Sequence, residues 1–166
     1  MAQYKSQRVG VFVDVQNMYY SAKNLFEAKV NFAKVLEEAV GTRQLVRAIA
    51  YVVKGPQSED DNFFTALEKI GFEIKTRQLQ VFLGGNKKGD WDVGICMDAI
   101  RMANKLDVVV LISGDGDFEE LVKYLKYSHG CTVEVLAFGR TASSKLKDEA
   151  DLFTDLGEQK KFLLKK

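Results

Sequence analysis

The chain has 166 residues, of which 46% are hydrophobic and 28% charged, and a formal net charge of +1. This length and composition are those of one globular domain with a sizeable core. So small a net charge excludes a global electrostatic field for nucleic acid, so any such binding needs a local basic rim. No apolar run approaches the ~20 residues of a membrane span, and the first residues lack the apolar segment of a signal peptide, which predicts a cytoplasmic protein without a membrane partner.

Cysteine and histidine are scarce, which narrows the chemistry. Cys96 and Cys131 are the only cysteines, too few for a disulfide framework and without metal-ligand spacing, so we expect two reduced, buried thiols. His129 is the only histidine. The chain therefore lacks the histidine and cysteine ligands that zinc hydrolases usually have and the histidines that acid–base catalysis usually needs.

Strands and helices alternate along the chain, which predicts an α/β fold with a mostly parallel sheet covered on both faces. The apolar run Arg8–Asp14 predicts a buried central strand. The first half is then expected to contain a helix over 17–28, a helix over 32–40 with Asn31 as its cap and Gly41 at its end, a strand over 44–53, a loop over 54–58, and a helix with an acidic start from 59 to 70.

The second half continues the alternation. We expect a strand over 72–77, an extension or short edge strand over 78–82, a basic loop over 84–89, a helix from the cap Asp90 to 104, a strand over 107–112, a helix over 118–128, a strand over 131–138, a helix over 143–150 and a short strand over 152–156. The prediction is a single domain over 1–157, followed by a C-terminal tail, 158–166, that frays.

Aspartates follow two of the predicted parallel strands. Asp14 ends the first strand, and Asp115 and Asp117 follow the strand over 107–112 in Ser113-Gly-Asp-Gly-Asp117. Parallel strands end at one crevice, where carboxylates repel each other unless a cation lies between them. With Asp92 from a nearby helix start, this oxygen-rich group suits Mg²⁺ or Mn²⁺ and predicts a metal-dependent phosphodiester-cleaving site.

Simpler interpretations stay open for the same residues. Asp14, Asp90 and Asp117 could each cap a helix, and Asn17 could hold the turn or orient Asp14. Asp98 lies about 120° round its helix from Asp92 at ~3.6 residues per turn, so an ion pair with a neighbouring Arg101 or Lys105 is the plainer interpretation. Trp91 and the pair Tyr19-Tyr20 could stack on bases or lie in the core.

Three segments in order resemble the NYN family, the LabA-like branch of the PIN-like nucleases. They are Val11-Phe-Val-Asp14-x-x-Asn17, Lys88-Gly-x-x-Asp92-Val and Leu111-Ile-Ser-Gly-Asp115-x-Asp117-Phe. The segment 144–156, with Ala150-Asp-x-Phe153, is similar to the usual ending of that family.

The resemblance implies a three-layer PIN-like (Rossmann-like) fold with strand order 3-2-1-4-5 and an endoribonuclease that uses Mg²⁺ or Mn²⁺ and leaves 5′-phosphate and 3′-hydroxyl ends. It implies metal binding by Asp14, Asp92 and Asp115, with Asp117 as an accessory catalytic acid and Asn17 and Ser113 in support. Candidates for contact with the RNA backbone are Lys87, Lys88, Lys54 and Arg77. A homodimer is compatible with the sequence.

Two other functions are compatible with the sequence. A non-catalytic regulator that binds RNA or a protein through the same crevice is favoured by the small net charge and opposed by the intact acids. A phosphatase with Asp14 as nucleophile is weaker, because such enzymes usually have a second aspartate two residues later, where this chain has Gln16.

Overall fold

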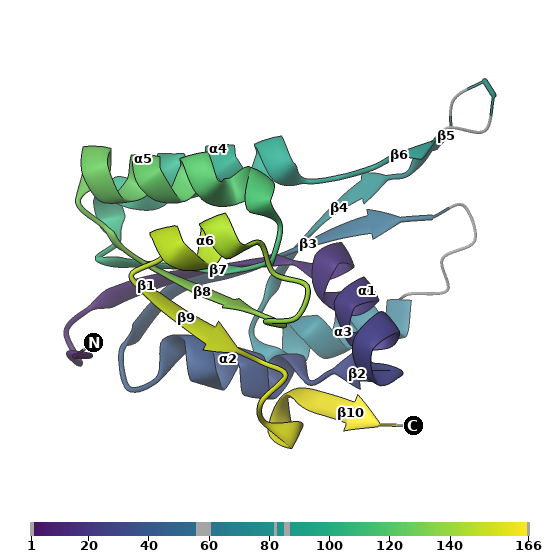
Figure 1. Cartoon of the computed structure of the whole chain (residues 1–166), viewed down its shortest axis with the longest axis horizontal. Helices are drawn as coiled ribbons and strands as arrows, with labels where there is room; N and C mark the ends of the chain where they lie inside the picture. Colours follow the sequence, from purple (N-terminus) through teal and green to yellow (C-terminus); the bar gives the residue numbers. More distant parts are fainter. Residues whose placement is uncertain (1, 56–60, 82, 85–86, 166) are drawn as a thin grey trace.

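A parallel sheet of six strands forms the centre of the computed structural model, which describes residues 2–55, 61–81, 83–84 and 87–165. The strand order is β4-β3-β1-β7-β8-β9, and all neighbours run parallel (Figure 1). The strands are β1 (Arg8–Asp14), β3 (Gln44–Lys54), β4 (Glu73–Gln78), β7 (Val108–Ile112), β8 (Thr132–Ala137) and β9 (Leu152–Asp155). The five main strands predicted from the sequence thus lie in the predicted order 3-2-1-4-5, and β9 extends the sheet at its edge.

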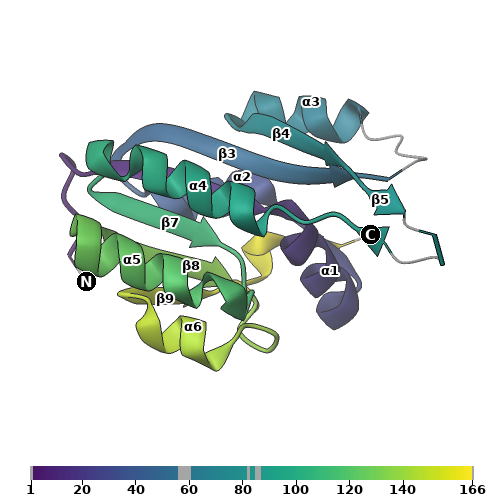
Figure 2. The same cartoon turned by 90° about the horizontal axis from the view of Figure 1, so that it is seen from above.

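Helices cover both faces of the sheet, giving the three layers of a PIN-like fold (Figures 1 and 2). One face packs against α1 (Val15–Phe26), α2 (Phe32–Val40) and α3 (Asp61–Ile70). The other packs against α4 (Asp92–Met102), α5 (Glu119–His129) and α6 (Ser144–Glu149). The central strands bury both of their faces, as their unbroken apolar runs predict. In β1, Val11 and Val13 belong to the first core and Phe12 to the second.

Short elements account for several differences from the predicted bounds. The expected helix over 17–28 is α1, which ends at Phe26 because Glu27 adopts the left-handed conformation with φ 50°. The chain then forms β2 (Ala28–Val30). Single 3₁₀ turns, η1 (Ala103–Lys105) and η2 (Gly116–Phe118), follow α4 and precede α5.

The expectation of a frayed C-terminal tail is wrong. The tail forms a 3₁₀ turn, η3 (Lys160–Phe162), and the strand β10 (Leu163–Lys165), which pairs antiparallel with β2. Phe162 is fully buried in the core on the face of the sheet that carries α1, α2 and α3, and its turn packs against α2. The burial of Phe162 and the pairing of β10 with β2 therefore attach this tail to the domain.

Two short strands, β5 (Gln80–Val81) and β6 (Lys87–Lys88), form an arm that projects from the body of the domain (Figure 1). Here β5 pairs antiparallel with β6, so the predicted short edge strand is present and part of the predicted basic loop is a strand. Residues 56–60 of the predicted loop and helix start lie outside the described residues.

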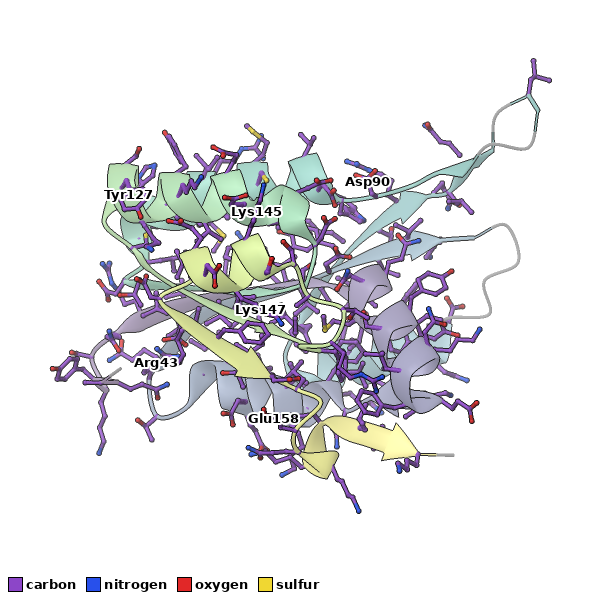
Figure 3. The ribbon with its side chains drawn as sticks, in the orientation of Figure 1. Arg43, Asp90, Tyr127, Lys145, Lys147 and Glu158 are labelled. Carbon is purple, nitrogen blue, oxygen red and sulfur yellow. The ribbon has the colours of Figure 1, made fainter. Side chains whose placement is uncertain are left out.

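A buried ion pair joins the end of α2 to the sheet. The Arg43 guanidinium, labelled in Figure 3, donates to both carboxylate oxygens of Glu134 in β8 at 2.8 and 2.9 Å and to the Ala39 carbonyl at 2.8 Å.

Both cysteines are free thiols; Cys131 is buried as expected, and Cys96 is half-buried. Among the described residues, no helix combines the length and the apolar composition that a bilayer crossing demands.

We predict that Phe162→Ala lowers the free energy of unfolding by about 3–5 kcal/mol, because a buried aromatic ring is replaced by a cavity. The matched control is Leu164→Ala in the same tail, where half of the side chain is exposed; it should change stability by less than ~1 kcal/mol. Urea denaturation measures both. Equal stability of the two variants would mean that the tail does not pack as described.

Candidate metal centre

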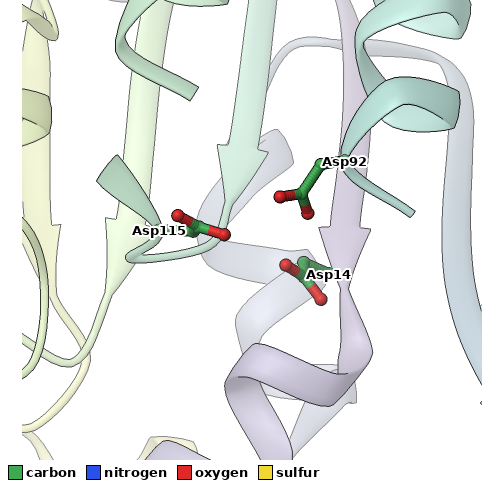
Figure 4. A group of neighbouring side chains, drawn as sticks. All are labelled: Asp14, Asp92 and Asp115. Atoms are coloured by element: carbon green, nitrogen blue, oxygen red, sulfur yellow. The ribbon is translucent and has the colours of Figure 1, made fainter. Parts of the chain in front are cut away.

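The carboxyl ends of β1 and β7 lie side by side and bring the predicted acids together. The two strands pair up to Val13 and Ile112, so the next residues, Asp14 and Ser113, follow at the same edge. In Figure 4 the side chains of Asp14, Asp92 and Asp115 point toward one another. One carboxylate oxygen from each lies within 4.8 Å of the others. We refer to these residues as the three-aspartate cluster.

Asp14 is both a helix cap and a member of the cluster. One of its carboxylate oxygens accepts a hydrogen bond from the Asn17 amide at 3.2 Å, which caps α1. The other accepts from the Ser113 hydroxyl at 3.3 Å. The capping and metal-binding interpretations are therefore compatible, since each carboxylate oxygen has a further lone pair for a cation.

Asn17 and Ser113 tie the first turn of α1 to the turn after β7. The Asn17 side-chain oxygen accepts from the Gly114 amide at 3.0 Å. The fully buried Ser113 hydroxyl accepts from the Asp115 amide at 3.2 Å while it donates to Asp14. Their contacts are those of residues that position the acids.

The sequence Gly-Asp-Gly-Asp folds differently from one expectation. Asp117 was a candidate cap for a helix from 118, but the cap is Asp115, whose carboxylate accepts from the Asp117 amide at 2.9 Å. The helical turn therefore starts at Gly116. A Cβ at this position would lie 2.8 Å from the Ser143 hydroxyl oxygen, so the close approach of Ser143 favours glycine here. Asp117 is exposed, and the cluster of carboxylate oxygens does not include it. Its catalytic role stays a prediction.

Contacts at the start of α4 place Asp92. The Asp90 carboxylate accepts from the Asp92 amide at 3.1 Å and so holds the turn before α4 (Figure 3). The N-cap position itself belongs to Trp91, which makes no side-chain capping hydrogen bond, and not to Asp90 as predicted. The Trp91 indole donates to the Val52 carbonyl in β3 at 3.0 Å. Arg77 lies 4.2 Å over the Trp91 ring and donates to the Asp90 carbonyl at 3.0 Å. Trp91 thus packs in the protein, and Arg77, a predicted RNA contact, also braces this helix start.

Asp98 anchors the middle of the same helix away from the cluster. It is buried and accepts from Lys75 at 2.7 Å, the Tyr51 hydroxyl at 2.8 Å and Arg101 at 3.3 Å. Burial alone would raise the pKa of Asp98, but the hydrogen bonds from Lys75 and Tyr51 hold it below its ordinary value. The predicted pair with Arg101 is present, and the stronger contacts with β3 and β4 were not visible in the sequence.

The other candidate RNA contacts are less defined. The Lys54 ammonium lies 4.8 Å over the Phe64 ring. The side chains of Lys87 and Lys88 lie outside the described residues. The assignment of these lysines to RNA stays a prediction.

The cluster concentrates negative charge in a partly buried place. Burial, followed by the charges of Asp115 and Asp90, raises the pKa of Asp92 from its ordinary value of 3.8 to about 7. Burial also raises the pKa of Asp14, although the hydrogen bonds from Asn17 and Ser113 oppose that change. A divalent cation would remove this penalty, and an all-oxygen set of three carboxylates fits Mg²⁺ or Mn²⁺.

A pocket of about 450 Å³ opens in front of the cluster. Besides the cluster itself, its lining residues are Gln16, Asn17, Tyr20, Ser21, Asn24, Asp90 and Thr141. Sequence reasoning did not assign Gln16, Ser21, Asn24 or Thr141 to the site. The spacing 17, 20, 21, 24 is that of one helix face and could have revealed the wall formed by α1; nothing in the sequence marked Thr141.

We predict that, in chelator, Asp92→Asn stabilises the protein increasingly as the pH rises from 5 to 8. A carboxyl whose pKa is raised by folding gives stability that is complete below its unfolded pKa and is lost as the pH rises through about 7. Asparagine carries no such loss. Melting temperatures of Asp92→Asn and of the wild type at several pH values measure the difference in stability. The control is Asp148→Asn, which changes an exposed carboxylate on α6. A constant difference across this range would contradict the raised pKa.

Fold and site together define a PIN-like domain, in which a parallel sheet collects carboxylates at the ends of its central strands. A family model described as the NYN domain matches residues 8–157. The chain therefore belongs to the NYN domain family, a family of PIN-like nucleases, as the sequence motifs predicted.

Two similar proteins extend this result over nearly the whole chain. The low amplitude and bright protein LabA of Synechococcus elongatus is 26% identical over 175 aligned positions, which cover 98% of this chain and 90% of LabA. A protein of unknown function from Vibrio parahaemolyticus, known from its crystal structure, is 33% identical in sequence and superposes with a TM-score of 0.88. The superposition covers 99% of this chain and 100% of the Vibrio chain.

Proposed function

We propose that this protein is an endoribonuclease that hydrolyses RNA phosphodiester bonds at an aspartate-bound Mg²⁺ or Mn²⁺. The observation that carries the proposal is the convergence of Asp14, Asp92 and Asp115 from three separate elements in a chain of a nuclease family. Such crowding costs stability unless a cation is bound.

Each residue of the site has a defined part in this proposal. The three-aspartate cluster holds the ion, Ser113 orients Asp14, and Asn17 fixes the turn that carries Asp115. When bound there, Mg²⁺ or Mn²⁺ would supply a water that is nucleophilic at neutral pH and a positive charge against the attacked phosphate. Asp117, exposed beside the cluster, is the proposed accessory acid. No covalent protein intermediate is required.

The substrate's backbone phosphates are the proposed partners of Lys87, Lys88, Lys54 and Arg77. The competing function, a regulator that binds RNA or protein without cleaving, is favoured by the net charge of +1. It predicts no metal-dependent cleavage at all. A homodimer and a cytoplasmic location stay predictions.

We expect purified protein to cleave a mixture of RNAs with Mg²⁺ or Mn²⁺ and not with chelator. Asp14→Asn and Asp115→Asn should each reduce the rate by roughly 100-fold or more, as loss of a group that stabilises transition-state charge does. RNA binding should persist or improve, because a charge that repels phosphate is gone. Asp148→Asn, which removes an exposed carboxylate on α6, should cleave like the wild type.

Gel analysis of end-labelled RNA measures the rates. Cleavage that survives both cluster substitutions would indicate a contaminating nuclease or another site and would overturn the proposal. Absence of metal-dependent cleavage by the wild type, with RNA binding intact, would favour the regulator.

We expect millimolar Mg²⁺ or Mn²⁺ to raise the melting temperature and chelator to lower it, because an ion that binds only the folded state stabilises it by mass action, by about 2.7 kcal/mol at 100 times Kd. The double variant Asp14→Asn/Asp115→Asn should lose this response and be more stable than the wild type without metal. Thermal shift titrations measure both. An unchanged wild-type melting temperature over the titration would count against a metal centre.

A further inference from the structure

The α1 wall of the pocket has a composition that a metal centre alone does not explain. Beyond the cluster it presents Gln16, Tyr20, Ser21 and Asn24 over two turns of α1. The pocket volume of about 450 Å³ is within the range of ~300–1,000 Å³ that small-molecule sites occupy. Space for a nucleotide therefore lies directly beside the acids.

The chemistry of this wall is neutral. It offers the amides of Gln16 and Asn24, the Ser21 hydroxyl and the phenol ring of Tyr20. Among the residues described as lining the pocket, none is lysine or arginine. Phosphate oxygens prefer cations, whereas amides and hydroxyls match base edges and an aromatic ring matches a base face. The wall is thus better suited to a base than to a phosphate.

Tyr20 is accessible and held in place. Half of its surface is exposed, and the Tyr19 ring meets it edge-on at 5.3 Å between centroids. Three residues earlier on the same helix, Asn17 is bonded to Gly114 in the turn that carries Asp115. The distance of Tyr20 from the cluster is therefore set by a rigid helix and a direct cross-link between α1 and the β7 turn.

We propose that Tyr20 stacks on an unpaired base of the nucleotide next to the phosphate bound at the cluster, while Gln16 and Asn24 hydrogen-bond base edges. This inference rests on the proposed function and deepens it, because it makes Tyr20 the residue of this site that selects an unpaired base. A base inside an A-form helix is stacked on both faces by its neighbours and cannot also stack on Tyr20.

The first test compares cleavage of a fluorescein-labelled 16-nucleotide single-stranded RNA with cleavage of the same strand annealed to its complement, both with Mn²⁺. The wild type should cleave the single strand faster. Tyr20→Ala should reduce kcat/KM on the single strand by roughly 5- to 150-fold, the range that loss of a base-stacking ring causes. Tyr20→Phe keeps the ring and should stay within about threefold of the wild type.

Two control variants separate stacking from a general effect of losing a tyrosine. Tyr19→Ala removes the neighbouring ring, which is 46% exposed but does not line the pocket. Tyr4→Ala removes an exposed ring near the start of β1, at the opposite end of the sheet. Both should cleave like the wild type, so a selective loss in Tyr20→Ala supports the proposal.

The second test replaces single nucleotides beside the cleaved bond by abasic ribose. At the stacked position, the abasic substitution should lower the cleavage rate of the wild type by as much as Tyr20→Ala lowers cleavage of normal RNA. Tyr20→Ala acting on the abasic RNA should then be little slower than either single change. Fully additive losses at every position, or a Tyr20→Ala variant as fast as the wild type, would overturn the inference.

The base-stacking role of Tyr20 can be tested even if the protein is not a nuclease. If the wild type does not cleave, fluorescence anisotropy with the same labelled single strand decides: binding that weakens 5- to 150-fold in Tyr20→Ala, and not in Tyr19→Ala, supports the base-stacking role in a non-catalytic protein. Equal binding by all three proteins would overturn it.

Discussion

The parallel pairing of β1 with β7 is the constraint on which the site depends. At the start of the pair, the Asp107 carboxylate accepts from both the Arg8 amide, at 2.7 Å, and the Arg8 side chain, which fixes the register. At its end, the same register sets Asp14 beside Ser113. Because a shift of one residue would reverse every side chain between the two cores, core packing and the placement of the acids are specified together.

The rest of the architecture holds together groups that repel one another. The pKa of Asp14 and that of Asp92 are both raised, so folding brings these carboxylates together at a cost. Packing and hydrogen bonds outside the three-aspartate cluster offset this cost, above all those that anchor α4: Trp91 bonds to β3, and Asp98 bonds to β3 and β4. These contacts hold the three-aspartate cluster in positions where one cation could bind all three carboxylates.

The order of the strands and the convergence of the acids could be predicted because they follow from regular features, alternating elements and polar residues after apolar runs. Phe162 shows the limit: a short tail after the last predicted strand is expected to fray, whereas the tail pairs with β2, a strand too short for a periodic signal, and Phe162 is buried in the core. Asp115 caps the turn before α5 and Asp117 does not, and the sequence leaves this choice open because both aspartates precede the helix. Trp91 was ambiguous because its partners Arg77 and Val52 lie on other strands.

The strand order β4-β3-β1-β7-β8-β9 also determines when each strand can find its partner during synthesis. The strand β1 lies near the N-terminus, yet its neighbour β7 begins after Asp107, 99 residues beyond Arg8. At ~5–20 residues per second, a ribosome needs roughly 5 to 20 s to add that stretch. Throughout this interval the edge of β1 that pairs with β7 in the folded protein has no partner, and an unpaired strand edge is open to pairing with other chains.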